Sequence, residues 1–230
     1  MISITELAMQ YGQKILFENA SLNFDPGKRY GLVGANGSGK STQTKRLAKR
    51  LQQEGHEVVL TREPGGSVGA EEIRALVLQG DPDRWSAETE ILLFTAARRD
   101  HLECTILPAL ASGKTVICDR FADSTRMYQG LSRGDLRKLV DCLHTLMIPR
   151  NPDITLLIDM DPEIGLSRAK ARSTKEERFE DFGLQLQQTM RTGFLALAKE
   201  YSDRFKVIDG HRSADNIAAD IYAQITAVIR

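Results

Sequence analysis

Cysteine is scarce in this sequence, and its few copies limit the kinds of site that the chain can build. The three cysteines, Cys104, Cys118 and Cys142, are odd in number, widely spaced and set in apolar surroundings. This usage argues against a disulfide framework or a metal cluster, and it predicts reduced thiols in the core of a cytoplasmic protein.

An excess of charge of one sign is also absent, because 31 lysines and arginines balance 31 aspartates and glutamates. No net field therefore draws the protein toward nucleic acid or an anionic membrane, and any anion binding must be local. No apolar run approaches the roughly 18 residues that a membrane span needs. The first residues also lack the pattern of a signal peptide. We expect a cytoplasmic protein with neither a nucleic-acid nor a membrane partner.

What the sequence does contain, from Gly31 onward, is an alternation of short aliphatic runs with longer helical patterns. Five runs have the length and boundaries of strands: RYGLVG, HEVVLT, KTVICD, PDITLLID and RFKVID. Helical patterns cover about 40–54, 70–79, 86–111, 133–147, 162–171, 177–201 and 213–229. Strands that are apolar on both faces and alternate with helices predict an α/β fold with a parallel sheet. In such a sheet, ligands gather at the carboxyl ends of the strands.

The first 28 residues follow a different pattern. Two strand-like runs flank Gly12, and Asp25, Pro26 and Gly27 have the order of a tight turn. This predicts an antiparallel β-ribbon over 1–28 that leads into a domain over 29–230. We expect the ribbon to pack on the edge of the sheet or to remain mobile.

The clearest motif is GANGSGKS, which has P-loop spacing and lies between a predicted strand and a predicted helix. In a P-loop, backbone amides and the helix start hold phosphates, the lysine reaches the β and γ oxygens, and the serine ligates Mg²⁺. The predicted nucleotide-binding residues are Gly34, Ala35, Asn36, Gly37, Ser38, Gly39, Lys40, Ser41 and Thr42. The motif predicts binding of a nucleoside triphosphate but does not name the reaction.

Residues 1–42 resemble the opening strands and P-loop of ATP-binding cassette proteins, in which Tyr11 would stack on adenine. Farther along, LSRGD and NPDITLLIDMD imitate a cassette signature and Walker B strand. However, Arg133 and Asp135 replace signature residues, and Met160 stands where a catalytic carboxylate is needed. The chain is also too short for the family's helical subdomain. A working cassette ATPase is therefore the disfavoured alternative.

From Gln43 to the C-terminus, the chain resembles thymidylate kinases of the bacterial type. Five motifs follow the order of that family: GHEVVLTREPGGSVGAEEIRALVL, ETEILLFTAARRDH, ILPALASGKTVICDRFADSTRMYQG, PDITLLIDMDPEIGLSRAKAR and ERFEDF. The resemblance implies the three-layer P-loop fold of nucleoside monophosphate kinases with a five-stranded parallel sheet. It also implies ATP and dTMP as substrates, Mg²⁺ and a homodimer. Together, the two resemblances predict a chimera joined between about Lys40 and Gln43.

Several residues of these motifs are candidates for binding the acceptor. Phe94 and Arg98 are four apart on one helical face, where a ring can stack on a pyrimidine and a guanidinium can donate to a carbonyl. The resemblance assigns them this role, although core packing is the ordinary role of a phenylalanine. His101 is interpreted as structural. The resemblance further implies substrate binding by Arg62, Arg74, Arg120, Ser124, Tyr128 and Gln129.

Asp119 and Arg120 end the strand TVICDR, where a parallel sheet presents ligand-binding residues. In the family, the arginine of this pair holds the acceptor phosphate, and the aspartate lies near Mg²⁺. The P-loop motif implies that Ser41 also ligates this ion. The alternative for Arg120 is a surface ion pair. The basic stretch RAKARSTKEERFED falls where these kinases carry a lid, about 165–182, although such a run is by default a solvated helical face. The predicted catalytic residues are Lys40, Asp119, Arg120, Arg168 and Arg172.

The sequence therefore predicts an enzyme that transfers the γ-phosphoryl group of ATP to dTMP. Two alternatives stay open: a nucleotide-binding or ATP-hydrolysing cassette-like protein, and a kinase for another pyrimidine monophosphate. The family's P-loop normally carries an acidic residue where Asn36 stands, and often a glutamate at the position of Val33. We therefore expect weakened acceptor binding or turnover, with ATP binding largely retained.

Overall fold

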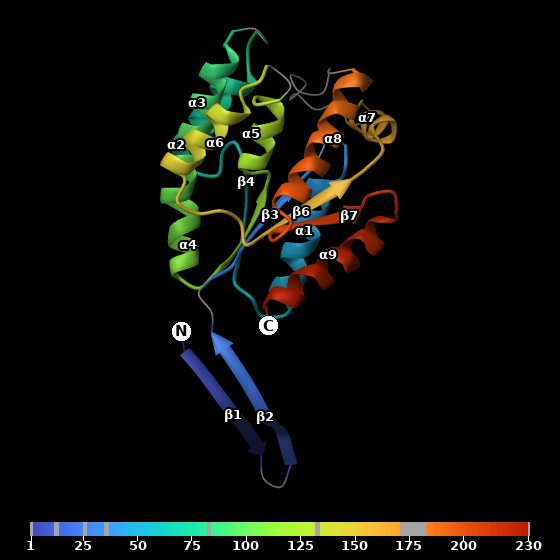
Figure 1. Ribbon diagram of the computed structural model, residues 1–230. Coiled ribbons are helices and arrows are strands. Elements are labelled where there is room, and N and C mark those ends of the chain that lie inside the picture. The colour runs from blue at the N-terminus through green and yellow to red at the C-terminus, as the bar shows by residue number, and fades with distance from the viewer. Residues whose placement is uncertain are drawn as a thin grey trace.

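A five-stranded parallel sheet forms the centre of the molecule (Figure 1). The computed structural model describes residues 2–11, 14–24, 27–34, 37–81, 84–131, 134–170 and 183–229. In sheet order, the strands are β4 (Val58–Arg62), β5 (Thr115–Asp119), β3 (Arg29–Val33), β6 (Ile154–Asp159) and β7 (Phe205–Asp209). These strands are the five aliphatic runs of the sequence, so the predicted α/β fold is confirmed.

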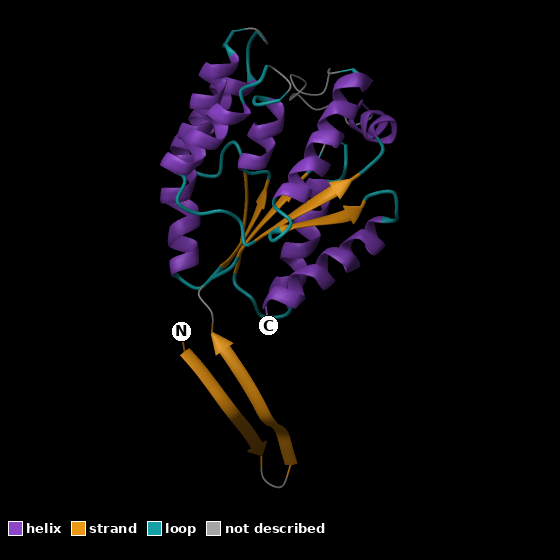
Figure 2. Cartoon of the chain, viewed as in Figure 1, coloured by secondary structure: helices purple, strands orange, loops and turns teal. Residues whose placement is uncertain are grey.

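Helices cover both faces of this sheet (Figure 2). They are α1 (Lys40–Gln53), α2 (Val68–Leu78), α3 (Ala87–His101), α4 (Leu107–Ala111), α5 (Ala122–Tyr128), α6 (Arg137–Met147), α7 (Pro162–Lys170), α8 (Leu184–Glu200) and α9 (Ala214–Ile229). A π-helical turn, η1 (Leu102–Ile106), joins α3 to α4, so the pattern predicted over 86–111 is one helical run with a local change of pitch. The part of the predicted helix 177–201 that precedes 183 lies outside the described residues. Among the helices described, none has the length and apolarity to cross a bilayer.

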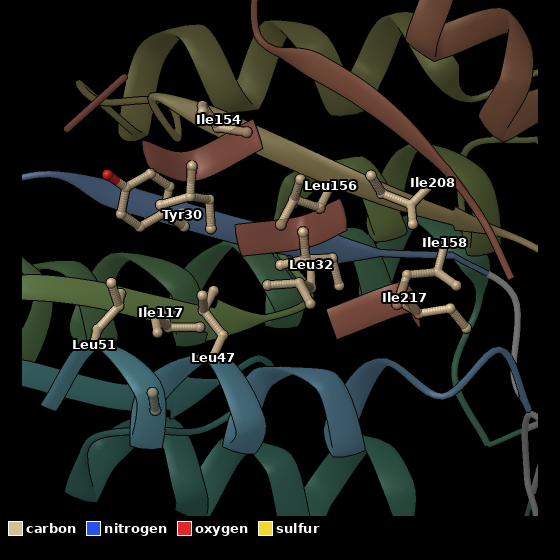
Figure 3. Packing of buried hydrophobic residues seen from close by; sticks show 13 residues of the cluster. Tyr30, Leu32, Leu47, Leu51, Ile117, Ile154, Leu156, Ile158, Ile208 and Ile217 are labelled. Atoms are coloured by element: carbon tan, nitrogen blue, oxygen red, sulfur yellow. The ribbon is translucent and has the colours of Figure 1, made fainter. Parts of the chain in front are cut away.

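The two faces of the sheet bury separate sets of side chains, because successive residues of a strand point in opposite directions. Leu32 and Leu156 pack with α1 and α9 (Figure 3), whereas Val33 and Leu157 pack with α5 and α8. Both faces of the central strands are therefore buried, which is why these strands read as continuous apolar runs.

Helix α5 is absent from the helices predicted from the sequence. Its seven residues, ADSTRMY, have no apolar periodicity, yet all of them are buried. The hydrophobic pattern misses this helix because its buried residues include four polar or charged ones, Asp123, Ser124, Thr125 and Arg126.

The N-terminal strands β1 (Ile2–Tyr11) and β2 (Lys14–Phe24) pair antiparallel, as the sequence predicts. They form a sheet of their own and add no strand to the parallel sheet (Figure 1). Of the predicted turn, Asp25 and Pro26 lie outside the described residues.

Only one of the three cysteines lies in the core. Cys118 on β5 is buried, but Cys104 and Cys142 are exposed. The prediction of three core thiols is therefore wrong for two of them. Both lie on helical turns, where the apolar neighbours in sequence do not set the face on which a residue falls.

Candidate active site

A cavity of about 550 Å³ lies at the carboxyl ends of β4 and β5, next to the loop that follows β3. Its lining includes residues of the phosphate loop together with the whole set of predicted substrate-binding residues. The predicted residues that line it are Gly37, Gly39, Lys40, Ser41, Arg62, Arg74, Phe94, Arg98, Asp119, Arg120, Ser124, Tyr128 and Gln129. The fold thus brings segments far apart in the sequence to one site.

The other predicted residues lie elsewhere. Gly34, Ser38 and Thr42 belong to the same loop and helix start but do not line the cavity. Arg168 is exposed on α7, with its Nη1 3.5 Å from Met160 Sδ, and it does not line the cavity either. Ala35, Asn36 and Arg172 lie outside the described residues.

The phosphate loop can carry no side chain at Gly37. This residue has φ +83°, and a Cβ added there would lie 1.9 Å from the carbonyl oxygen of Gly165 on α7. Gly39, with φ +90°, precedes α1, whose first residue, Lys40, is only 6% exposed. The loop therefore places the lysine at a helix N-terminus, where the helix dipole also favours an anion.

Ser41 and Asp119 meet at the edge of the cavity. Ser41 Oγ donates a hydrogen bond to Asp119 Oδ2, although the two residues are 78 positions apart. The other carboxylate oxygen, Oδ1, is buried and accepts no hydrogen bond from the described residues. A hydroxyl and a carboxylate with an unpaired buried oxygen are the hard oxygen donors that Mg²⁺ prefers. The two predicted metal ligands therefore fit the ion.

Arg120 occupies a strained position at the end of β5. Its φ of +70° lies in the left-handed region, where no other described non-glycine residue is found. The backbone amide of Arg120 donates to Leu32 O at 2.9 Å, and Cys118 Sγ donates to Arg120 O at 3.0 Å. Its guanidinium carbon lies 5.1 Å from the centre of the Tyr128 ring. The turn thus holds an arginine in the cavity directly after Asp119.

Arg98 is fixed by two hydrogen bonds to residues that also line the cavity. Its Nε donates to Glu63 Oε2 at 2.7 Å, and its Nη2 donates to Thr125 Oγ1 at 2.9 Å. Burial alone would raise the pKa of Glu63, but the charge of Arg98 and the contact with His101 bring this pKa below its ordinary value. His101 Nδ1 lies 3.4 Å from Glu63 Oε1, and its Nε2 lies 2.7 Å from Thr61 Oγ1. Arg98 is therefore anchored to an ionised carboxylate.

Sequence reasoning missed the part that Glu63 and Thr125 play. They lie 35 and 27 positions from Arg98, so no local spacing links them. The resemblance placed Glu63 in a motif, Arg62-Glu63-Pro64, that shapes the acceptor pocket, but it did not indicate the pairing with Arg98. Phe121 was also missed: the guanidinium carbon of Arg98 lies 5.3 Å from the centre of its ring.

The remaining predicted residues of the acceptor side lie around the cavity. Phe94 is 8% exposed and lines it, so the ring both packs in the core and faces the pocket. At the rim, Arg62 pairs with Glu71 at 3.1 Å, and Arg74 Nη1 donates to Pro64 O.

Comparison with known proteins decides the family. The sequence model of the family described as thymidylate kinase matches residues 32–221. The thymidylate kinase of Ruegeria pomeroyi is 75% identical over 188 residues, which are 82% of this chain and 89% of that protein. This chain belongs to the thymidylate kinase family. The thymidylate kinase of Dinoroseobacter shibae is 61% identical over 201 residues, 87% of this chain and 97% of that protein.

The likeness extends to three dimensions. A crystal structure of thymidylate kinase from Ehrlichia chaffeensis superposes with a TM-score of 0.70 at 32% identity and covers 87% of this chain and 100% of that one. The family match begins at Leu32, inside β3. The thymidylate kinase match therefore includes the phosphate loop, ahead of the predicted start at Gln43, and leaves out the β-ribbon.

Proposed function

We propose that this thymidylate kinase transfers the γ-phosphoryl group of ATP to dTMP, giving dTDP and ADP. The observation that carries the proposal is the single cavity lined by Lys40, Asp119, Arg120, Phe94 and Arg98. A triphosphate held by the phosphate loop and a nucleotide held by the arginines would share this space. The family names of the relatives support the choice of dTMP as acceptor.

On the donor side, the loop amides and Lys40 would bind the β and γ phosphates. Ser41 and Asp119 would hold Mg²⁺, which when bound supplies positive charge against the phosphate oxygens. Arg120 would hold the acceptor phosphate in line with the γ-phosphoryl group. Phosphoryl transfer depends mainly on such positioning and on charge neutralisation, so no protein nucleophile is needed.

On the acceptor side, Phe94 would stack on the thymine ring and Arg98 would donate to its O4. Gln129 would contact the pyrimidine edge. Ser124 and Tyr128 on α5 would close over the base and sugar. At the rim of the cavity, Arg62 and Arg74 would complete the acceptor pocket, with Arg74 directed at the monophosphate.

We assign the lid to 165–182, with Arg168 and Arg172 as the arginines that close on the transferring phosphate. The close approach of Gly37 to Gly165 supports this assignment, because a phosphate loop that can carry no arginine at position 37 must receive one from elsewhere. We also propose a two-part organisation, with a ribbon over 1–28 and a kinase domain over 29–230. We further propose that the protein is cytoplasmic and forms a homodimer.

Residues 1–42, which include the β-ribbon, the first strand of the parallel sheet and the P-loop, are proposed to derive from a cassette protein. The start of the family match at Leu32 supports a foreign ribbon. If the loop is hybrid, Asn36→Glu should lower the KM for dTMP or raise kcat, while the KM for ATP stays nearly constant. Steady-state kinetics measure this, and unchanged constants for dTMP would contradict the hybrid-loop account.

A coupled ADP-release assay tests the proposed activity. It compares dTMP, dUMP, CMP and no acceptor under saturating ATP and Mg²⁺. The proposal predicts ADP release that depends on dTMP. Hydrolysis without an acceptor would favour the cassette-like alternative, and a preference for CMP would favour a kinase for another pyrimidine monophosphate.

A further inference from the structure

Glu90 is a fully buried carboxylate next to the acceptor site. It lies on α3, four residues before Phe94 and eight before Arg98, so the three share one face of the helix. Its side chain is 0% exposed, and it does not line the cavity itself. A buried acidic residue at this position needs a role that outweighs the free energy of its desolvation.

The contact between Glu90 and Gln129 indicates that role. Gln129 directly follows α5 as its C-cap, is 2% exposed and lines the cavity. Its Nε2 donates to Glu90 Oε2 at 3.3 Å. A carboxylate only accepts hydrogen bonds, whereas an amide can turn either its nitrogen or its oxygen to a partner. Glu90 therefore selects the orientation in which the amide nitrogen faces the carboxylate and Oε1 remains for a ligand.

Two buried glutamates thus fix which atoms two cavity-lining side chains offer to a ligand, hydrogen-bond donors in one case and an acceptor in the other. Glu63 holds Arg98, which offers only donors, and Glu90 holds Gln129, whose oxygen is an acceptor. A keto pyrimidine presents the complementary edge, because its O4 accepts and its N3–H donates. Cytosine presents the reverse, because its N4 donates and its N3 accepts. The pocket is therefore matched to thymine and uracil and mismatched to cytosine.

We propose that Glu90 is a specificity-determining positioning residue, which fixes the amide of Gln129 so that the enzyme accepts keto pyrimidines and rejects cytosine. The inference rests on the proposed function, because it requires the acceptor base to lie between Phe94, Arg98 and Gln129. It concerns the choice of acceptor and not the chemistry of phosphoryl transfer.

The variant Glu90→Gln tests this proposal, because it keeps the shape of the side chain but can donate as well as accept. Its matched control is Glu88→Gln, which removes the same charge from an exposed position on the same helix. We expect the ratio of kcat/KM for dTMP to that for dCMP to fall by about tenfold in Glu90→Gln and to stay unchanged in the control. The ratio for dTMP to dUMP should hold within about twofold, because both bases present the same edge.

Equal losses with dTMP, dUMP and dCMP would overturn the proposal, since that result describes general damage to the site. An unchanged ratio of dTMP to dCMP would overturn it as well. The exchange variant Glu90→Gln with Gln129→Glu provides a second test. There the amide at position 90 can donate to the new carboxylate, whose free oxygen accepts N3–H, so the preference for dTMP should return. Gln129→Glu alone places two carboxylates together and should bind all three acceptors poorly.

Calorimetric titration of the same proteins with dTMP, dUMP and dCMP, without ATP, separates this inference from the proposed activity. A wild-type protein that turns over no acceptor would contradict the kinase function. Even then, the binding data would decide the role of Glu90. They would show whether the wild-type protein prefers dTMP and dUMP to dCMP, and whether Glu90→Gln loses this preference. Equal binding of dTMP and dCMP by the wild-type protein would overturn the proposal.

Discussion

Arg98 and Glu63 are each 4% exposed, and their charged groups meet at 2.7 Å. A pair this deeply buried gives little net stability over an apolar pair, but removing one partner leaves the other charge buried and uncompensated. The value of the pair is therefore positional: it fixes a guanidinium that lines the cavity.

The variant Glu63→Gln tests this at the residue scale. Without the carboxylate, Arg98 loses its anchor, and the KM for dTMP should rise by about tenfold while the KM for ATP stays constant. Steady-state kinetics with each substrate varied in turn measure the two constants. The exposed Glu72→Gln on α2 serves as the control and should change neither. Equal rises in both constants would mean that Glu63 supports the fold rather than the acceptor site.

The predictability of the site also differs from residue to residue. Lys40 and Arg98 were found because each belongs to a motif whose spacing reflects local geometry, either a loop before a helix or one helical face. The roles of Glu63 and Glu90 as partners of Arg98 and Gln129 were missed because these partners come from other elements. Such pairing is a property of the fold, and no local pattern in the sequence encodes it.

At the scale of elements, α5 is held by charge on the side away from the cavity. Asp123 is 0% exposed and accepts from Arg126 Nη1 at 2.8 Å and from Arg204 Nη2 at 2.7 Å. Burial would raise the pKa of Asp123, but the bonds to the two arginines bring it below its ordinary value. A seven-residue helix has little stability of its own. These ion pairs therefore keep Ser124 and Tyr128 in the cavity wall, and they explain why a helix without apolar periodicity forms there.

Helix α6 carries a histidine that should make stability depend on pH. His144 lies edge-on to Phe121, and its Nε2 is 2.7 Å from Asn151 Oδ1. Burial, followed by the charge of Arg126, lowers the pKa of His144 to about 4. The unfolded chain takes up this proton below about pH 6.5, whereas the folded state resists it until about pH 4. The stability that this histidine contributes is therefore fully present above pH 6.5 and is lost as the pH falls toward 4.

Urea denaturation of His144→Gln and of the wild-type protein between pH 7 and pH 4.5 measures this effect. The wild-type protein should lose about 2 kcal/mol more over that range than the variant, because glutamine does not titrate. Parallel losses in the two proteins would show that other groups govern the pH dependence.

Strand β3 begins with a buried arginine whose guanidinium is incompletely hydrogen-bonded among the described residues. Arg29 is 0% exposed, and its Nε and Nη1 bond to nothing among the described residues. Its Nη2 donates to Arg150 O, and its guanidinium carbon lies 4.6 Å from the centre of the Phe121 ring. Burial lowers the pKa of Arg29 to about 10, which reflects the cost of desolvating the charge.

We expect Arg29→Met to raise the free energy of unfolding by about 1 kcal/mol, because methionine fills similar space without a charge. Chemical denaturation at neutral pH measures it. The control Arg150→Met changes a partly exposed arginine and should shift stability little. A loss of about 2 kcal/mol or more would mean that the arginine supports the core instead.

At the scale of the whole molecule, the parallel sheet and the P-loop were predictable because alternating strands and helices permit few arrangements. The match to the family over 32–221 covers this sheet except for the start of β3. The ribbon β1–β2 lies before the match and pairs only within its own sheet. Its place in the molecule was not predictable, because no apolar periodicity connects it to the core.

In the proposed reaction, this fold presents a triphosphate and dTMP to each other across Asp119. The most direct measurement is a crystal structure with dTMP, Mg²⁺ and a non-hydrolysable ATP analogue. We expect thymine on Phe94 with O4 at Arg98, the acceptor phosphate at Arg120, and the γ-phosphate of the analogue at Lys40 in line with it. A structure in which the two nucleotides occupy separate sites, or in which dTMP lies outside the cavity, would contradict it.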